Sequence, residues 1–388
     1  MDRVTECAIS LIRAEICGDT DIKHYNLNEE ESVRLIEFCI EHDIAALVGT
    51  AVNNFNAEID ADISDAFASH IMMAVYRYER IKYEYDKLCR LFEDAGIKFV
   101  PLKGTVVRNL YPNPELRTSC DIDILVHEDD LGATEKILLE SGDYKSDTKG
   151  SHDITFFGKS GLHIEIHFSL IEYWDSDDDI LRRPWEYVSY PSGGCRGEFT
   201  NEFMITYHIA HIAKHFIHGG SGIRNFIDLW LMKRKLEYDD EKLSTLIECA
   251  KMTTFADNAC RLSDIWFSKK GEYTPLLLNM ENFILGAGIY GSTESKAAMD
   301  CAVYGGKLAN LKEKFFRPLS VLQYEFPFLK KHPRLYPIAV PMRWVRILFS
   351  GRLHSIAHEV SVSNSLKGEK LNSTSAMLEE LNLMNSEN

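Results

Sequence analysis

Two aspartates separated by one residue are the side chains whose spacing most directly suggests chemistry. Asp121 and Asp123 open the apolar run DIDILV at 121–126. Because alternate side chains of a strand share a face, both carboxylates point to one side while Ile122 and Ile124 point to the other. A lone pair of this kind also occurs where an exposed strand begins, so its meaning depends on its companions.

A third carboxylate comes from LHIEIHF at 162–168, where Glu165 alternates with Ile164 and Ile166. Three converging acids repel one another unless a cation neutralises them, and Mg²⁺ prefers such hard oxygen ligands. Two ions can clamp the attacking and leaving oxygens of a phosphoryl displacement. We therefore predict that Asp121, Asp123 and Glu165 are catalytic and bind two Mg²⁺ ions, with Mn²⁺ as a possible substitute.

A glycine turn precedes these acids at Lys103-Gly104-Thr105, directly after the apolar run IKFVPL at 97–102. Glycine lets backbone N–H groups and the start of a helix approach a phosphate without a Cβ in the way. We predict that Lys103, Gly104 and Thr105 bind a nucleotide, with Lys103 adding positive charge. A purely structural turn is the alternative.

Arg117 and Ser119 stand just before the acids. A guanidinium here would either neutralise a phosphate or pair with Asp121 and fix its rotamer. We predict that both residues help to bind the nucleotide. A structural salt bridge explains Arg117 equally well.

A histidine-rich helix follows at FMITYHIAHIAKHFIHGGSG, with His208, His211, His215 and His218 along one stripe. A pair four residues apart can hold zinc, and a packed histidine face is the plainer interpretation. We predict that Lys214 and His215 bind the triphosphate or the leaving pyrophosphate. Further along, Arg224 and Asp228 have the four-residue spacing of a helix ion pair.

The elements that must position these residues predict an α+β chain. Residues 1–94 have helical periodicity, and Gly96 is expected to end the last of these helices. Residues 95–190 read as strands at 97–102, 121–126, around ITFF and at 162–168, with helices from Thr105 and over LGATEKILLESG. This pattern predicts a small mixed-sheet core, with a helical carboxy-terminal region at 201–360. A polar, partly disordered tail is expected at 361–388.

Composition limits the partners and the compartment. The formal charge of −16 disfavours a long nucleic acid held through phosphate contacts. Nine cysteines without a C-x-x-C pair indicate reduced thiols, and no apolar run is long enough to span a membrane. We expect a cytoplasmic protein that has no signal peptide and no membrane segment and does not bind a membrane. Nothing in the sequence indicates an oligomeric state.

The combination of LKGTVVRNLY, PELRTSCDIDILV and LHIEIHFSL resembles the polymerase-β-like nucleotidyltransferase superfamily, and within it the bacterial family of uncharacterised nucleotidyltransferases. The resemblance covers about 95–230. It implies that Gly104 and Thr105 form the phosphate turn and that Asp121, Asp123 and Glu165 hold the metal. The sequence departs from the superfamily in two ways. Lys103 stands where a small residue is usual, and the gap from the turn to the acids is longer than in many members.

The resemblance implies transfer of a nucleoside monophosphate from a triphosphate such as ATP to a hydroxyl of an unidentified acceptor, with release of pyrophosphate. A small-molecule acceptor is favoured because of the acidic charge. Two alternatives stay open. One is a non-catalytic nucleotide- or partner-binding protein with the same fold, which Lys103 in the turn keeps plausible. The other is a zinc hydrolase built on the histidine helix.

Overall fold

The structure is a computed structural model that describes residues 1–19, 25–171, 179–349, 351 and 353–384. The chain divides into two compact units, each described separately below. Within the described ranges, the first unit contains 1–171, 179–211 and 222–273 apart from the gap at 20–24, and the second contains 212–221 and the described part of 274–384. Among the described residues, no helix has the length and apolar character needed to cross a membrane.

Four helices form the amino-terminal part of the first unit: α1 (Arg3–Cys17), α2 (Glu29–Glu41), α3 (Ala45–Asn54) and α4 (Ala61–Asp94). Apolar residues recur at helical spacing throughout residues 32–52, but the structure divides this segment between α2 and α3. Asp43 has a φ of 54° in the break, a conformation that no helix continues through. Gly96, with a φ of 67°, follows the end of α4.

A five-stranded mixed sheet forms the core, with the strand order β1-β2-β5-β4-β3. Only β2 and β5 pair in parallel. The strands are β1 (Phe99–Pro101), β2 (Asp121–Val126), β3 (Tyr144–Lys149), β4 (Asp153–Gly158) and β5 (His163–His167). The edge strand β3 is absent from the sequence prediction, because only Tyr144 in YKSDTK is buried and the segment lacks an apolar alternation.

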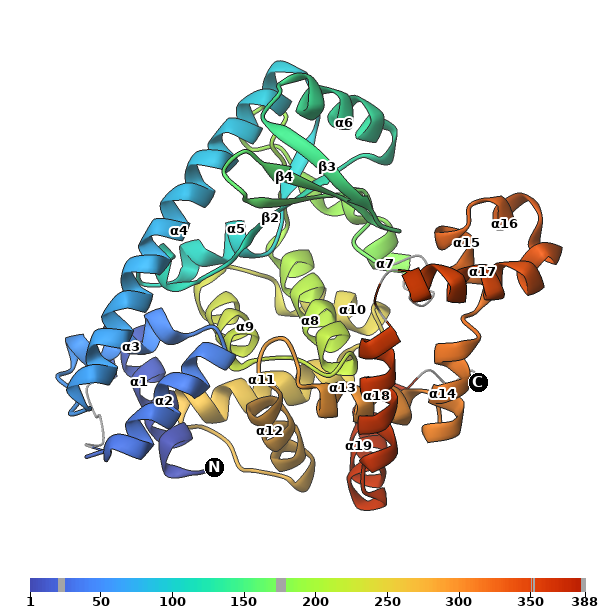
Figure 1. Ribbon diagram of the computed structural model, residues 1–388. Coiled ribbons are helices and arrows are strands. Elements are labelled where there is room, and N and C mark those ends of the chain that lie inside the picture. Colours follow the sequence, from blue (N-terminus) through green and yellow to red (C-terminus); the bar gives the residue numbers. More distant parts are fainter. Residues whose placement is uncertain (20–24, 172–178, 350, 352, 385–388) are drawn as a thin grey trace. The chain divides into compact units, whose positions relative to one another are not determined.

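One face of the sheet packs on α4 and α6 (Leu131–Glu140), as Figure 1 shows. The isoleucines of β2 and β5 join apolar residues of both helices in one cluster. On α4 these residues recur at helical spacing, which explains why a single helix can cover the strands. They are Ile81, Tyr85, Leu88 and Phe92. Packing of this face leaves the alternate side chains of β2 and β5 on the opposite face.

The link from β1 to β2 is mostly short turns of helix. The helix expected from Thr105 is a single turn, α5 (Gly104–Val107), followed by 3₁₀ turns at Arg108–Leu110 and Pro114–Leu116. The remaining elements of the first unit include α7 (Asp179–Arg182), a small hairpin and the helices α9 (Ile223–Lys235), α10 (Asp240–Cys249) and α11 (Thr253–Ser268). The hairpin consists of β6 (Val188–Ser189) and β7 (Glu198–Phe199). Helix α8 (Asn201–Ile217) begins in the first unit and ends in the second.

The second unit is helical: α12 (Pro275–Ala287), α13 (Thr293–Val303), α14 (Lys307–Phe315), α15 (Leu319–Glu325), α16 (Phe328–Lys331), α17 (Tyr336–Phe349), α18 (Leu353–Ser365) and α19 (Gly368–Glu380). The predicted polar tail at 361–388 therefore contains the end of α18 and all of α19. Met377, Leu378 and Leu381 are buried, so this segment has enough apolar side chains to pack. Residues 385–388, where disorder was expected, lie outside the described residues.

Candidate active site

The parallel pairing of β2 with β5 brings the carboxylates together. The register places Asp121 opposite His163 and Asp123 opposite Glu165. Their alternates, Ile122, Ile124, Ile164 and Ile166, have no exposed surface and fix the register through the core. The acids that the sequence singles out as metal ligands therefore emerge side by side on one face.

Two overlapping groups of side chains on this face are close enough to hold a metal ion. Potential ligand atoms of Asp121, His163 and Glu165 lie within 4.8 Å of one another, and so do those of Asp123, Glu165 and His167. Glu165 belongs to both groups. Each group offers two carboxylates and one imidazole, and the carboxylate oxygens suit Mg²⁺ or Mn²⁺, so the donor set fits a divalent cation.

The two histidines are neighbours that the sequence analysis left without a role. His167 is 3% exposed, and its Nε2 donates to Asp123 Oδ1 at 2.8 Å. The same nitrogen is 3.3 Å from Glu165 Oε2, and His163 Nδ1 is 3.6 Å from Glu165 Oε1. The strict alternation of HIEIH is the signal that could have placed both rings beside Glu165.

Lys103 places a positive charge directly beside the carboxylates. Its Nζ donates to Asp123 Oδ1 at 2.8 Å, and both side chains are mostly buried. Burial by itself lowers the pKa of Lys103, but the Asp123 carboxylate raises it above its ordinary value. The backbone of Lys103 has a φ of 44°, a region that glycine tolerates far better than lysine. The surrounding structure holds this conformation at the cost of local strain.

The pKa values of the two aspartates are shifted in opposite directions. Burial would raise the pKa of Asp123, but the Lys103 ammonium and the hydrogen bond from His167 lower it well below its usual range. Burial, and then the charge of Asp123, raises the pKa of Asp121. One ammonium therefore neutralises Asp123 and leaves excess negative charge at Asp121 and Glu165.

Gly104 is required where it stands because Arg117 lies against it. A Cβ at this position would be 2.4 Å from Arg117 Nη1 and 3.3 Å from Ser119 Cβ. Arg108 Nε donates to the Gly104 carbonyl at 2.7 Å, and its guanidinium also donates to the Ser119 hydroxyl. The Thr105 hydroxyl oxygen is buried without a hydrogen-bond partner. Two arginines thus fix the turn: Arg117 packs against Gly104, and Arg108 hydrogen-bonds its carbonyl oxygen.

Arg117 has a structural partner other than the predicted Asp121. Its Nη2 donates to Asp228 Oδ2 at 2.8 Å, and the Tyr111 hydroxyl donates to Asp228 Oδ1 at 2.7 Å. The expected helix pair of Arg224 with Asp228 does not form, because Arg224 pairs with Asp43 and donates to the Thr118 carbonyl at 3.0 Å. Tertiary contacts replace the local pair that the four-residue spacing indicates.

The histidine helix is divided between the two units. His208, in the first unit, is buried with Nε2 2.9 Å from the Asn225 carbonyl oxygen, as a packed histidine would be. Lys214 and His215 belong to the second unit, and His218 Nδ1 is 2.8 Å from the Lys214 carbonyl oxygen. Within the described residues, neither metal-competent group includes a histidine of this helix. The nucleotide contacts of Lys214 and His215 stay a prediction.

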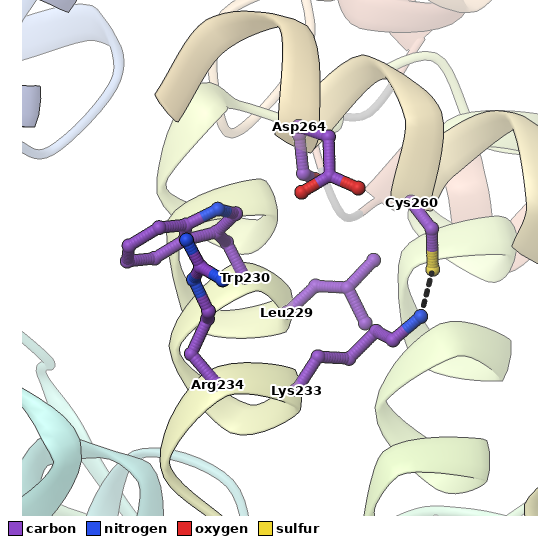
Figure 2. Close-up of a pocket in the computed structure, with 7 residues that line it drawn as sticks. Leu229, Trp230, Lys233, Arg234, Cys260 and Asp264 are labelled. Carbon is purple, nitrogen blue, oxygen red and sulfur yellow. Dashed lines mark hydrogen bonds between the residues drawn. The ribbon is translucent and has the colours of Figure 1, made fainter. Parts of the chain in front are cut away.

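A pocket between α9 and α11 is lined by none of the site residues described above. Figure 2 shows Lys233 facing Cys260 there, with Nζ 3.6 Å from Sγ. The other lining residues are Leu229, Trp230, Arg234, Ser263 and Asp264. Burial raises the pKa of the Cys260 thiol, which disfavours its thiolate form.

The mixed sheet thus presents carboxylates on two adjacent strands, and the turn at Lys103 and Gly104 leads into the segment before β2. The family model for uncharacterised nucleotidyltransferases matches residues 28–268, more than half of the chain. The protein therefore belongs to the uncharacterised nucleotidyltransferase family. A search of curated proteins found no match.

Two solved structures are similar to part of the chain. One is the solution structure of the antibiotic-resistance factor ANT(2'')-Ia, with 12% identity, a TM-score of 0.35, and coverage of 45% of this chain and 92% of that one. The other is the crystal structure of an antigenic nucleotidyltransferase-like protein from Paracoccidioides brasiliensis, with 13% identity, a TM-score of 0.29, and coverage of 44% and 88%.

Proposed function

We propose that this protein transfers a nucleoside monophosphate from a nucleoside triphosphate to a hydroxyl of a small acceptor. The acceptor oxygen forms a bond to the α-phosphorus, the bond from that phosphorus to the bridging oxygen breaks, and pyrophosphate leaves. The hydroxyl proton is released to water. The family supports this class of reaction, and the observation that carries the proposal is the β2–β5 register that joins three carboxylates.

Asp121, Asp123 and Glu165 are proposed to hold two divalent cations, Mg²⁺ or Mn²⁺. When bound, such ions neutralise the phosphates and make the acceptor hydroxyl easier to deprotonate. The chain supplies the positions. Asp121 and Glu165 carry the excess negative charge, and His167 orients the Asp123 carboxylate. Catalysis then depends mainly on positioning and charge.

Lys103, Gly104 and Thr105 are proposed to bind the triphosphate. Lys103 must give up its ion pair before a cation can use Asp123 fully, and its released ammonium then has the phosphates as its natural partner. The buried Thr105 hydroxyl and the Gly104 backbone lie in the same turn. Arg117 and Ser119 are proposed to support nucleotide binding by positioning this turn, because Arg117 is already paired with Asp228 and Ser119 already accepts a hydrogen bond from Arg108.

Lys214 and His215 remain proposed ligands of the triphosphate or the leaving pyrophosphate. ATP is one candidate triphosphate, and the net charge of −16 favours a small acceptor over a long nucleic acid. A cytoplasmic location belongs to the same proposal. The Lys103–Asp123 ion pair supports the alternative of a binding protein without turnover, because it already neutralises the most buried acid of the cluster.

The test combines metal binding with turnover. Mn²⁺ binding is measured by electron paramagnetic resonance, and pyrophosphate release is measured with ATP, Mg²⁺ and a panel of sugars, antibiotics and peptides as acceptors. For an active acceptor, Asp123→Asn should lower the rate roughly 10²-fold or more, as expected for loss of one preorganised electrostatic group. Asp147→Asn, an exposed acid on β3, is the matched control and should leave the rate unchanged.

Each outcome has a distinct meaning. Mn²⁺ binding without pyrophosphate release from any acceptor favours the non-catalytic alternative. Full activity in Asp123→Asn, or no Mn²⁺ binding by the wild type, contradicts the proposed site.

A further inference from the structure

The second unit contains a strongly basic segment within an acidic protein. Residues 307–349 contain nine Lys and Arg side chains and two Glu, so their formal charge is 9 − 2 = +7, against −16 for the whole chain. The segment runs from α14 to α17. It also lies beyond residue 268, where the family match ends. The family's shared chemistry therefore does not account for it.

Helix α17 in this segment has a buried face and, in addition, an exposed apolar face where a surface helix is usually polar. Ala339, Arg343 and Ile347 recur every fourth residue and form its buried face. Ile338, Met342, Val345 and Phe349 follow at helical spacing on another face and are 56%, 44%, 51% and 88% exposed. A polar face is expected there, so this apolar stripe fits something outside the unit.

Exposed basic side chains occur on α17, at Arg346, and in the two short elements just before it, at Lys331 and Arg334. Lys331, Arg334 and Arg346 are all exposed, whereas Arg343 is turned inward and is held by Glu325 and the Lys314 carbonyl. Figure 1 shows α17 in the second unit beside α15 and α16, the helix that carries Lys331. The exposed part of this segment therefore combines the apolar stripe of α17 with three exposed cations on α17 and the elements next to it in the chain, which together are called the cationic rim below.

We propose that α17 lies on the surface of a membrane containing anionic lipids, with its apolar stripe inserted between the headgroups. An apolar helix face bordered by Lys and Arg is the pattern of interfacial helices, and anionic headgroups complement the rim. With 14 residues, about 21 Å at the α-helical rise, α17 is too short to span the bilayer and must lie in its plane.

Two other partners for the apolar stripe are disfavoured, one by charge and one by the apolar side chains. A symmetric contact with a second copy would bring two segments of +7 together, which electrostatic complementarity disfavours. A nucleic acid would meet the basic rim but would gain nothing from four exposed apolar side chains. The inference is independent of the nucleotidyltransferase proposal, since it uses none of the active-site residues.

The experiment is cosedimentation of the full chain with two kinds of vesicle, one of phosphatidylcholine and one of equal amounts of phosphatidylcholine and phosphatidylglycerol. We expect binding to the anionic vesicles that weakens with salt. The variant Ile338→Ser/Val345→Ser/Phe349→Ser should lower the partition coefficient roughly tenfold or more. The variant Lys331→Gln/Arg334→Gln/Arg346→Gln should lower the partition coefficient roughly 10²-fold, because each Lys or Arg near an anionic surface contributes about a factor of five.

A matched control comes from α4, where Met72 and Tyr76 are 73% and 56% exposed in the first unit. Met72→Ser/Tyr76→Ser should bind vesicles like the wild type. Circular dichroism confirms that each variant is folded, which is expected because the replaced side chains are exposed. Failure of the wild type to bind anionic vesicles overturns the proposal, and so does undiminished binding by the serine variant. A dimer that the serine variant dissociates would assign the stripe to a second copy.

Discussion

Two buried ionic clusters in the first unit differ in how completely their charges are satisfied. In one, Asp228 accepts hydrogen bonds from Arg117 and Tyr111 on both oxygens and has no exposed surface. In the other, Lys103 and His167 both bind Asp123 Oδ1, while Asp121 and Glu165 add further negative charge nearby. The first cluster is a closed ion pair, and the second has an excess of acid.

This difference separates a structural role from a functional one. A buried ion pair with complete hydrogen bonding fixes geometry, and here Arg117 fixes the position of the glycine turn through its contact with Gly104. A cluster with surplus carboxylates attracts a further cation. Breaking each cluster in turn should therefore change different observables, stability in the first and cation binding in the second.

The largest expected effect is on stability, from Asp228→Asn. Removing this charge leaves the Arg117 guanidinium buried and uncompensated, which should lower the free energy of unfolding by about 3–5 kcal/mol. Urea denaturation of wild type and variant measures the change. Asp257→Asn, an exposed acid on α11, is the matched control and should alter stability by less than about 0.5 kcal/mol. Equal stability of Asp228→Asn and wild type would show that the pair is dispensable.

A smaller effect should appear in the pH dependence of that difference. Burial raises the pKa of Asp228, but Arg117 and then His208 lower it below its ordinary value. A group of this kind stabilises the fold fully above its unfolded pKa of about 3.9 and loses that contribution as pH falls through its folded pKa. The stability gap between wild type and Asp228→Asn should therefore narrow below about pH 4. A gap that stays constant in acid, measured by urea denaturation, would contradict the assignment.

The sequence predicts the parts of the site that depend on local alternation. DIDILV and HIEIH specify both strands and the face that each carboxylate occupies, because apolar and polar residues alternate strictly. Long-range partners have no such signal. Arg117 and Asp228 are 111 residues apart, and Arg224 pairs with Asp43 across 181 residues instead of with its neighbour four positions away.

The positive φ of Lys103 is equally invisible in the sequence. A lysine is not a residue that indicates left-handed backbone, so the sequence places it in a glycine turn without showing that its ammonium reaches Asp123. The edge strand β3 was missed for a related reason, since five of its six residues are exposed. In both cases tertiary contacts decide the conformation.

The last and smallest effect concerns Lys103 and sharpens the distinction between the clusters. If its ammonium competes with a cation for Asp123, Lys103→Met should raise Mn²⁺ affinity about tenfold without nucleotide, because a nearby positive charge is removed. The same variant should bind a non-hydrolysable ATP analogue more weakly, since one phosphate partner is lost. Calorimetry measures both affinities.

Lys98→Met, an exposed lysine just before β1, is the matched control and should change neither affinity. The opposite signs matter most, because general loosening of the fold would weaken both ligands together. A purely structural Lys103 would therefore weaken the binding of both ligands or change neither. An exchangeable ammonium predicts tighter metal and weaker triphosphate in one protein, as expected for a side chain that changes partners when the nucleotide binds.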